Sequence, residues 1–292
     1  MEKTFTTQGK VRVFVDNQVG LIAVTARPGN ESQVVVTLEP DTPGATEFVD
    51  AAVVERRASR DHEHVIVKIP RLHGMKFVRR NGVTVRVETP PGSDVAVACG
   101  SGPVELNGVL GIVDVKTASG DVTADDVEEF SGKTASGDVE VGTVKGQLRL
   151  QTASGDLRCV RADGRVSVKT ASGDVEVGSA GDRVDVRGAS GDIRLGEVVG
   201  DLSVVAVSGD VQVLSIAHGR ANLRSVSGAV EVGVARGTAL MVDAESMSGT
   251  VHSDIALNDA PAPSEGDRNV VLTVRSVSGN VLVTRAAEAF TR

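Results

Sequence analysis

The stretch TASGDLRCVRADGRVSVK (residues 152–169) runs directly into TASGDVEVGSAGDRVDVR (residues 170–187), and the two units carry similar residue types at equivalent positions. Each unit contains two apolar–polar–apolar triplets, such as Val175–Glu176–Val177 and Val184–Asp185–Val186, separated by a bend that carries glycine. Alternation at a period of two is typical of strands, and the glycines indicate turns. The stretch therefore predicts two short strands per unit with no helix between them.

The Ser–Gly pair of this unit recurs along most of the chain. Copies begin at Ser101, Ser119, Ser136, Ser154, Ser172, Ser190, Ser208, Ser227, Ser248 and Ser278, at intervals of 18, 17, 18, 18, 18, 18, 19, 21 and 30 residues. Two strands per unit could form the hairpins of a sandwich or the rungs of a β-solenoid. The solenoid is favoured because the same residue types return in every unit, as stacked coils require. We predict an all-β, single-stranded parallel β-helix with about 18 residues per coil.

Stacking of the units places equivalent residues in rows. The predicted inward rows are Val139/Leu157/Val175/Ile193/Val211/Val230, Val141/Cys159/Val177/Leu195/Val213/Val232 and Leu150/Val168/Val186/Val204. Between the first two rows lies an outward row of alternating sign, Glu140, Arg158, Glu176 and Arg194. Coils in register would bring these opposite charges together, which a hairpin sandwich does not predict.

A further row precedes each Ser–Gly pair and grows in size along the chain. It consists of Ala118, Ala135, Ala153, Ala171 and Ala189, followed by Val207, Val226, Met247 and Val277. This growth predicts a wider cross-section or a different packing of that corner towards the C-terminal end.

Three regions are expected along the chain. Residues 1–92 lack the Ser–Gly mark but hold strand-like runs at 11–15, 21–24, 34–38, 65–69 and 83–87, which predict irregular coils or a β cap. Residues 93–284 form the regular solenoid, with a Pro/Gly-rich loop inserted near 256–270. Residues 285–292 contain good helix formers and predict a short C-terminal cap.

Composition limits the class of protein. The 292 residues include no Trp or Tyr, six Phe and 33 Gly, and the formal net charge is -8. The interior must then consist of small aliphatic side chains, and the charge is unsuited to general nucleic-acid binding. Met1 leads into a polar run without a signal-like segment, and no apolar stretch is long enough to span a membrane, so we expect a cytoplasmic protein. Two cysteines, Cys99 and Cys159, imply no disulfide framework.

The series of TASGDV-type motifs has characteristic flanks. It is preceded by VIVKIP (residues 65–70) and VRVETPPGSDVAV (residues 85–97) and followed by TVRSVSGNVLV (residues 273–283). Together these segments resemble the bacterial putative-adhesin β-strand-repeat family, a domain of unknown function, from about Val11 to Thr284. The resemblance implies a right-handed β-helix that is often found in envelope-associated proteins, and it brings no catalytic residue set.

Two groups of side chains are candidate metal ligands. The Asp row consists of Asp121, Asp138, Asp156, Asp174, Asp192 and Asp210. Calcium binds Gly-x-Asp turns in nine-residue β-rolls, but here each turn has one carboxylate, so we predict that Ser and Asp bond local backbone N–H groups instead. His62 and His64, with His73 in the following loop, lack a third ligand at a fixed spacing. We therefore expect no metal and no cofactor.

The densest basic cluster is the candidate partner-binding site. It comprises Arg56, Arg57, Arg60, Lys68, Arg71, Lys76, Arg79 and Arg80. Phe77 is its only aromatic residue, so the cluster lacks stacking platforms for single-stranded nucleic acid, and we predict a docking edge for a protein or polymer. A second basic row, Lys116, Lys133, Lys169 and Arg187, is interrupted by Gln151 and Val205 and is predicted to be a solvated charge ladder.

No catalytic motif accompanies the repeats: the sequence has no Gly-x-Ser-x-Gly elbow, no phosphate-binding loop and no dinucleotide fingerprint. We therefore expect a non-enzymatic, adhesin-like binding or scaffold protein that presents a mixed-charge surface to a protein or polymer. One alternative is a self-assembling scaffold similar to bactofilins, with self-association as its only requirement. The other is a carbohydrate-active enzyme on a solenoid.

Overall fold

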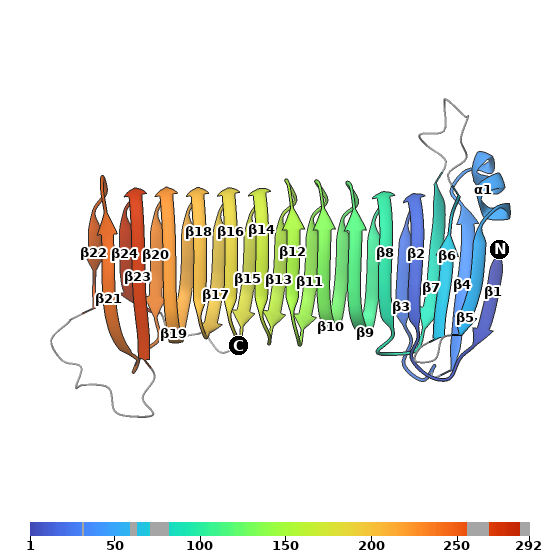
Figure 1. Ribbon diagram of the computed structural model, residues 1–292, viewed down its shortest axis with the longest axis horizontal. Coiled ribbons are helices and arrows are strands. Elements are labelled where there is room, and N and C mark those ends of the chain that lie inside the picture. The colour runs from blue at the N-terminus through green and yellow to red at the C-terminus, as the bar shows by residue number, and fades with distance from the viewer. Residues whose placement is uncertain (31, 59–62, 71–81, 256–268, 287–292) are drawn as a thin grey trace. The chain divides into compact units, whose positions relative to one another are not determined.

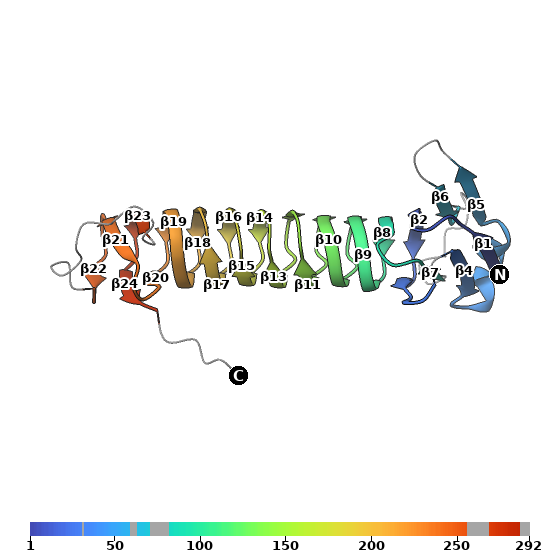
Figure 2. The same cartoon turned by 90° about the horizontal axis from the view of Figure 1, so that it is seen from below.

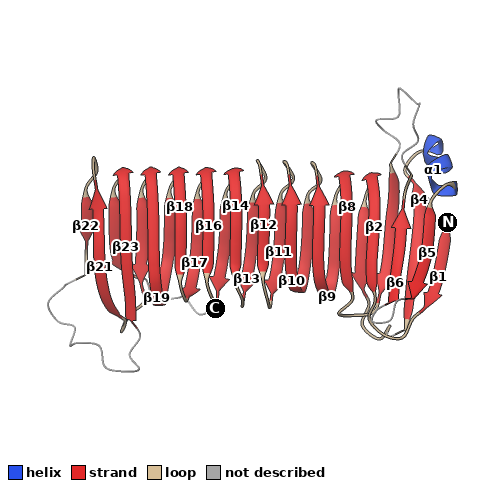
Figure 3. Ribbon diagram, viewed as in Figure 1, coloured by secondary structure: helices blue, strands red, loops and turns tan. Residues whose placement is uncertain are grey.

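The computed structural model describes residues 1–30, 32–58, 63–70, 82–255 and 269–286, and the regular structure in them is almost entirely strand (Figures 1 and 3). Two helical segments are short exceptions, η1 (Pro43–Ala45) and α1 (Thr46–Asp50). No helix in these ranges is long and apolar enough to cross a membrane. The chain divides into two compact units, Met1–Lys145 and Gly146–Arg292, which are described separately below.

Unit 1 contains eleven strands among its described residues. They are β1 (Glu2–Thr6), β2 (Arg12–Val19), β3 (Ile22–Ala26), β4 (Gln33–Pro40), β5 (Val53–Ala58), β6 (Glu63–Lys68), β7 (Val83–Thr89), β8 (Asp94–Ser101), β9 (Val104–Thr117), β10 (Val122–Thr134) and β11 (Val139–Val144). All five strand-like runs of residues 1–92 are strands: β2, β3, β4, β6 and β7. The sequence did not indicate β1 or β5.

Pairing in unit 1 is mostly parallel. The exceptions among the described strands are the antiparallel pairs β1–β4, β4–β7 and β5–β6, all formed before residue 90. From β8 onwards β8–β9, β9–β10 and β10–β11 are parallel. Parallel coils therefore begin in this unit after an opening segment that also uses antiparallel pairing. The domain boundary at residue 92 stays a prediction.

Unit 2 contains thirteen strands among its described residues. They are β12 (Leu148–Thr152), β13 (Leu157–Ala162), β14 (Val166–Ser172), β15 (Val175–Ala180), β16 (Val184–Ser190), β17 (Ile193–Val199), β18 (Leu202–Ser208), β19 (Val211–Ser227), β20 (Val230–Val234), β21 (Ala239–Ser246), β22 (Val251–Ser253), β23 (Asn269–Ser278) and β24 (Val281–Arg285). Even-numbered β14, β16 and β18 lie on one side and β13, β15 and β17 on the other (Figure 2).

Strands on each side of unit 2 pair in parallel register with the equivalent strand of the next coil. Val175 pairs with Ile193, and Val184 pairs with Leu202. The predicted inward rows are buried: Val175, Val177, Ile193 and Leu195 are each 1% exposed. Cys159 is equally buried, in register with Val177, as expected of a small apolar side chain in this row.

The last coil of the chain is inserted between the two coils before it. β23 pairs with both β19 and β21, and β24 pairs with both β20 and β22. The chain thus passes over one rung and then returns to fill it. The loop predicted near 256–270 falls mainly in residues 256–268, and the predicted cap in residues 287–292, which lie outside the described residues.

Glycine at the Ser–Gly corner is explained by the stacking. A Cβ atom on Gly173 would overlap the carbonyl oxygen of Gly155, and one on Gly191 would overlap that of Gly173. The same contact recurs at Gly120, Gly137, Gly209, Gly228, Gly249 and Gly279. The corner is therefore a column of backbone with no room for a side chain, which is why the repeat keeps this residue.

Candidate binding surface

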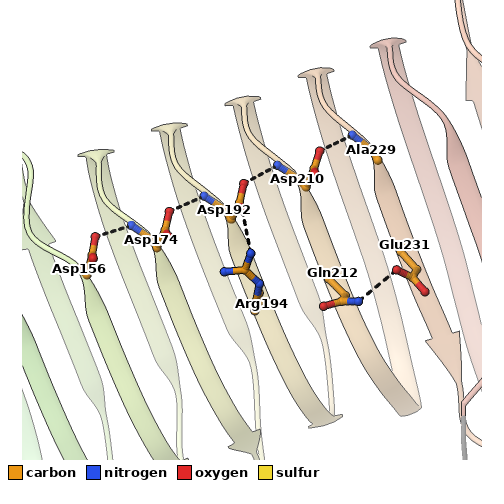
Figure 4. A network of polar contacts seen from close by, with 8 residues as sticks. All are labelled: Asp156, Asp174, Asp192, Arg194, Asp210, Gln212, Ala229 and Glu231. Atoms are coloured by element: carbon orange, nitrogen blue, oxygen red, sulfur yellow. Dashed lines mark hydrogen bonds and ion pairs between the residues drawn. The ribbon is translucent and has the colours of Figure 1, made fainter.

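The Asp row joins successive coils of unit 2. Asp156 Oδ1 accepts the Asp174 N–H at 2.8 Å, Asp174 Oδ1 accepts the Asp192 N–H at 2.8 Å, and Asp192 Oδ1 accepts the Asp210 N–H at 3.0 Å (Figure 4). The row ends at Asp210, which accepts the Ala229 N–H at 2.8 Å. The predicted backbone bonding is thus present, but it reaches the next coil and not the local turn.

The local bond of the corner is made by threonine. Thr117, Thr134 and Thr152 each accept, through Oγ1, the N–H of the glycine three residues later, at 3.0, 2.9 and 2.8 Å. In the ranges that the structure describes, no three His, Cys, Asp or Glu side chains gather as a metal site. The hydrogen bonds of Asp156, Asp174, Asp192 and Asp210 assign a structural role to this part of the Asp row, because one carboxylate oxygen of each accepts a backbone N–H group.

The alternating charge row forms only in part. Glu176 is in register with both Arg158 and Arg194. Arg158 Nε lies 3.1 Å from Glu176 Oε2, whereas the Arg194 guanidinium turns to Asp192, at 2.8 Å (Figure 4). The register was thus predicted, and the partner of Arg194 was not.

Three of the eight residues of the predicted basic cluster lie in the described part of the chain: Arg56, Arg57 and Lys68, whose Nζ lies 5.7 Å from the centre of the Phe14 ring. On β5, Arg56 Nη2 contacts Glu63 at 2.8 Å and Arg56 Nη1 donates to the Thr6 carbonyl at 2.6 Å. Arg57 lies 2.6 Å from Glu55. Both arginines therefore have a carboxylate beside them. The remaining candidates, Arg60, Arg71, Lys76, Arg79 and Arg80, lie outside the described residues, so the docking edge stays a prediction.

Unit 2 holds a different cluster, which we call the arginine quartet: Arg183, Arg187, Arg220 and Arg224. Register pairs Arg187 with Val205 and Val205 with Arg224. Arg183 and Arg220 immediately precede Val184 and Ala221, which occupy equivalent places in β16 and β19. The quartet therefore occupies the corners of a field three strands wide, with β18 in the middle.

The middle of this field is hollow because β18 carries short side chains there. Ser203 lies in register between Asp185 and Asn222, and Val205 lies between two arginines. The quartet, Ser203, Val205 and Asn222 line a groove of about 540 Å³. Two strand spacings separate its sides, or about 10 Å, and four residues separate its ends, or about 13 Å.

The groove is electropositive. The lining holds four arginines and one carboxylate, Asp201, so its formal charge is +3, and Asp185 lies beside the groove in register with Ser203. Arg187 Nε lies 3.2 Å from Asp185 Oδ1, and Asp201 Oδ1 accepts the Arg220 backbone N–H at 3.0 Å. Within the described chain, the side chains of Arg183, Arg220 and Arg224 have no ion pair, and all three residues are exposed.

Sequence reasoning found Arg187 but missed the rest of the quartet. It followed one row along the coils, and that row is broken by Val205. The quartet is visible along single strands instead, because RVDVR (residues 183–187) and RANLR (residues 220–224) each place arginine on both sides of a strand triplet.

An apolar hollow of about 430 Å³ adjoins the groove at Val205 and Arg224. Its wall is the enlarged corner row, which we call the valine corner: Val207, Val226, Val277 and Met247. These side chains are 46, 46, 45 and 79% exposed. The predicted change of packing at this corner is therefore an outward one, since the larger side chains extend the surface and not the core.

Arg275, at the edge of the hollow, is fully paired. Its Nη2 lies 2.6 Å from Asp243 Oδ2 and its Nε 3.5 Å from Glu245 Oε2. The hydrogen bond from Arg275 lowers the pKa of Asp243. Among the described residues of this surface, the arginines without an ion pair are thus Arg183, Arg220 and Arg224.

A family profile matches residues 18–284 of the chain, and it is that of Toastrack DUF4097. No curated protein matches. Solved structures that align include a putative adhesin from Parabacteroides merdae, with 11% identity over 97% of this chain and 95% of that one and a TM-score of 0.39. A putative adhesin from Parabacteroides distasonis has 14% identity, coverage of 97% and 96%, and a TM-score of 0.38. A putative lipid binding protein from the same species has 12% identity, coverage of 96% and 96%, and a TM-score of 0.38. Identities and TM-scores this low give no information about the function of this chain.

Proposed function

We propose that this chain, which belongs to the Toastrack DUF4097 family, is a non-enzymatic, adhesin-like binding protein whose arginine quartet takes an anionic protein or polymer. The observation that carries this proposal is the groove itself, where four guanidinium groups surround a hollow and only Arg187 is ion-paired within the described residues. Guanidinium groups bind carboxylate, sulfate and phosphate through paired, charge-assisted hydrogen bonds.

The size of the field favours a ligand with several negative groups. Because the backbone positions of the arginines lie about 10 to 13 Å apart, a ligand with several negative groups matches the spread of the quartet better than a single small anion does. A chain with repeated negative groups contacts several in turn, and each further contact is intramolecular and gains from the high effective concentration. Exposed charges interact weakly one at a time, so this multiplicity supplies the affinity.

The proposal includes the absence of catalysis and the finer geometry of the coil. The groove lining consists of arginine, aspartate, serine, asparagine and aliphatic side chains, a set suited to holding anions. We also propose right-handed winding with about 18 residues per coil, because parallel strands in one sheet are almost always joined by right-handed crossovers.

The test measures the anisotropy of fluorescein-labelled poly-L-glutamate and of labelled polygalacturonate at low salt. Arg220→Glu/Arg224→Glu should weaken binding of either probe by at least about tenfold, since two cations become anions. The matched control is Arg161→Glu/Arg194→Glu, which makes the same change of net charge on the other row of strands. Equal losses in the two variants would show that binding is diffuse and would refute the quartet. Shortening of polygalacturonate during the assay would refute the non-enzymatic part.

A further inference from the structure

Unit 1 carries a surface with the opposite character to the quartet and the valine corner. We call it the acidic patch: Val109, Ile112, Asp126, Glu128 and Glu129, on β9 and β10. Val109 and Ile112 are 45 and 47% exposed, large values for aliphatic residues within parallel strands. Register places Val109 beside Asp126 and Ile112 beside Glu129. Each exposed aliphatic side chain therefore has a carboxylate as its neighbour.

The charges of this patch are available to a partner. Asp126 and Glu129 are exposed and have no ion pair among the described residues. Glu128 has only Lys145 nearby, 4.0 Å away, with both side chains more than half exposed. The patch thus places unpaired acids next to exposed aliphatic side chains. Among the described residues most of the other exposed aliphatic side chains lie in unit 2, so such a surface is uncommon in unit 1.

The surface in unit 2 has the complementary arrangement. Arg224 lies in register with Val205 and two residues from Val226 on β19, and Arg220 lies in register with Val271, so these two free arginines also have exposed aliphatic neighbours. Acidic groups beside aliphatics on one surface match basic groups beside aliphatics on the other. Such matching lets ion pairs form while apolar area is buried next to them.

We infer that a second copy of this chain is a partner of the quartet, with the acidic patch of one copy docked on the quartet and valine corner of the next. The inference rests on the proposed function, because it names an occupant for the same groove. The two surfaces are different, so the contact is heterologous: each copy keeps one free surface of each kind. Association therefore continues into a ring or an open filament.

The strength of this contact depends on salt. Both surfaces are exposed, and the chain as a whole carries a charge of -8, so copies repel at long range while the patches attract at short range. The association is expected to be favoured at low salt and high protein concentration and to be lost at high salt.

The test is light scattering after size-exclusion chromatography across protein concentration. At about 20 mM salt the weight-average mass should rise above the 30.1 kDa of one chain to at least twice that value, and at about 0.5 M salt it should return to one chain. Arg220→Glu/Arg224→Glu and Asp126→Arg/Glu129→Arg should each remain monomeric at low salt. Arg161→Glu/Arg194→Glu is the matched control and should associate like the parent chain.

Mixing the two monomeric variants gives the sharpest outcome. The first keeps an intact acidic patch and the second keeps an intact quartet, so one productive contact remains. The mixture should form a 1:1 dimer that does not grow further. A parent chain that stays monomeric at low salt, or a mixture that forms no dimer, would overturn the inference. Binding of poly-L-glutamate by a monomeric parent chain would at the same time leave the proposed function standing.

Discussion

Gly173 illustrates why the repeat requires glycine at the Ser–Gly corner. A side chain there would overlap the backbone of Gly155, whereas a Cβ atom on Gly188, which also lies in unit 2, would meet only side-chain carbons at 3.6 and 3.7 Å. We therefore expect Gly173→Ala to cost on the order of 3 kcal/mol or more in the free energy of unfolding, because two coils must separate to admit the methyl group. Gly188→Ala should stay within about 1 kcal/mol of the parent chain. Urea denaturation measures both. Similar midpoints for the two variants would contradict the stacked glycine corner.

The two cysteines give the chain a pH-dependent stability. Burial raises the pKa of Cys99 and of Cys159 from 9.0 to about 11. A thiol with a raised pKa in the folded state stabilises the fold fully below pH 9, and this contribution is lost as the pH rises through about 11. We expect the urea midpoint to fall over that interval, and to fall less in Cys159→Val, which places in this position the residue that its neighbour Val177 has and leaves no proton to lose. The same decline in both chains would assign it to other groups.

The Asp row stabilises the stacking of neighbouring coils, because each carboxylate accepts a backbone N–H group of the coil that follows. Asp174→Ala leaves the Asp192 N–H without its partner and should cost about 1 kcal/mol. Asp174→Asn keeps an oxygen in the same place and should recover most of that loss. Added calcium should leave the midpoints of all three chains unchanged. Equal stability of the Ala and Asn variants would show that the bond contributes nothing.

Elements were predictable here where the information is local and repeated. The inward rows follow from alternation within a strand, and their register follows from the fixed spacing of Ser–Gly. The outward turn of Val207 and Val226 does not follow, since alternation assigns no side to a residue at a bend. To find the quartet, one must compare two strands that are two coils apart, β16 and β19, and recognise that the short residue between them, Ser203, leaves a hollow.

At the scale of the molecule, the order of the last coils in unit 2 was not contained in the repeat. The Ser–Gly corner makes the same contact with any neighbouring coil: Gly279 stacks on Gly228, and Gly249 stacks on Gly279. Each coil therefore offers a compatible edge to several others, and the sequence pattern alone does not select among them. The 30-residue interval before Ser278 is long enough for the chain to return past a coil, but its length does not indicate between which coils the last coil inserts.

This order has a measurable consequence for the coil that precedes β23 in sequence. Within the described residues β21 pairs only with β23, so its protection from hydrogen exchange depends on a strand that follows it in the chain. Leu272 is 0% exposed and lies in β23, in register with Val242. Leu272→Ala should cost about 2–5 kcal/mol locally and speed amide exchange in residues 239–246 as well as in β23. Leu150→Ala, at an equally buried position in β12, should leave residues 239–246 unchanged. The amides of β21 cannot stay protected once the strand that supplies their hydrogen-bond partners has opened. If β21 stays protected while β23 exchanges, then β21 pairs with a different strand and the inserted position of the last coil is wrong.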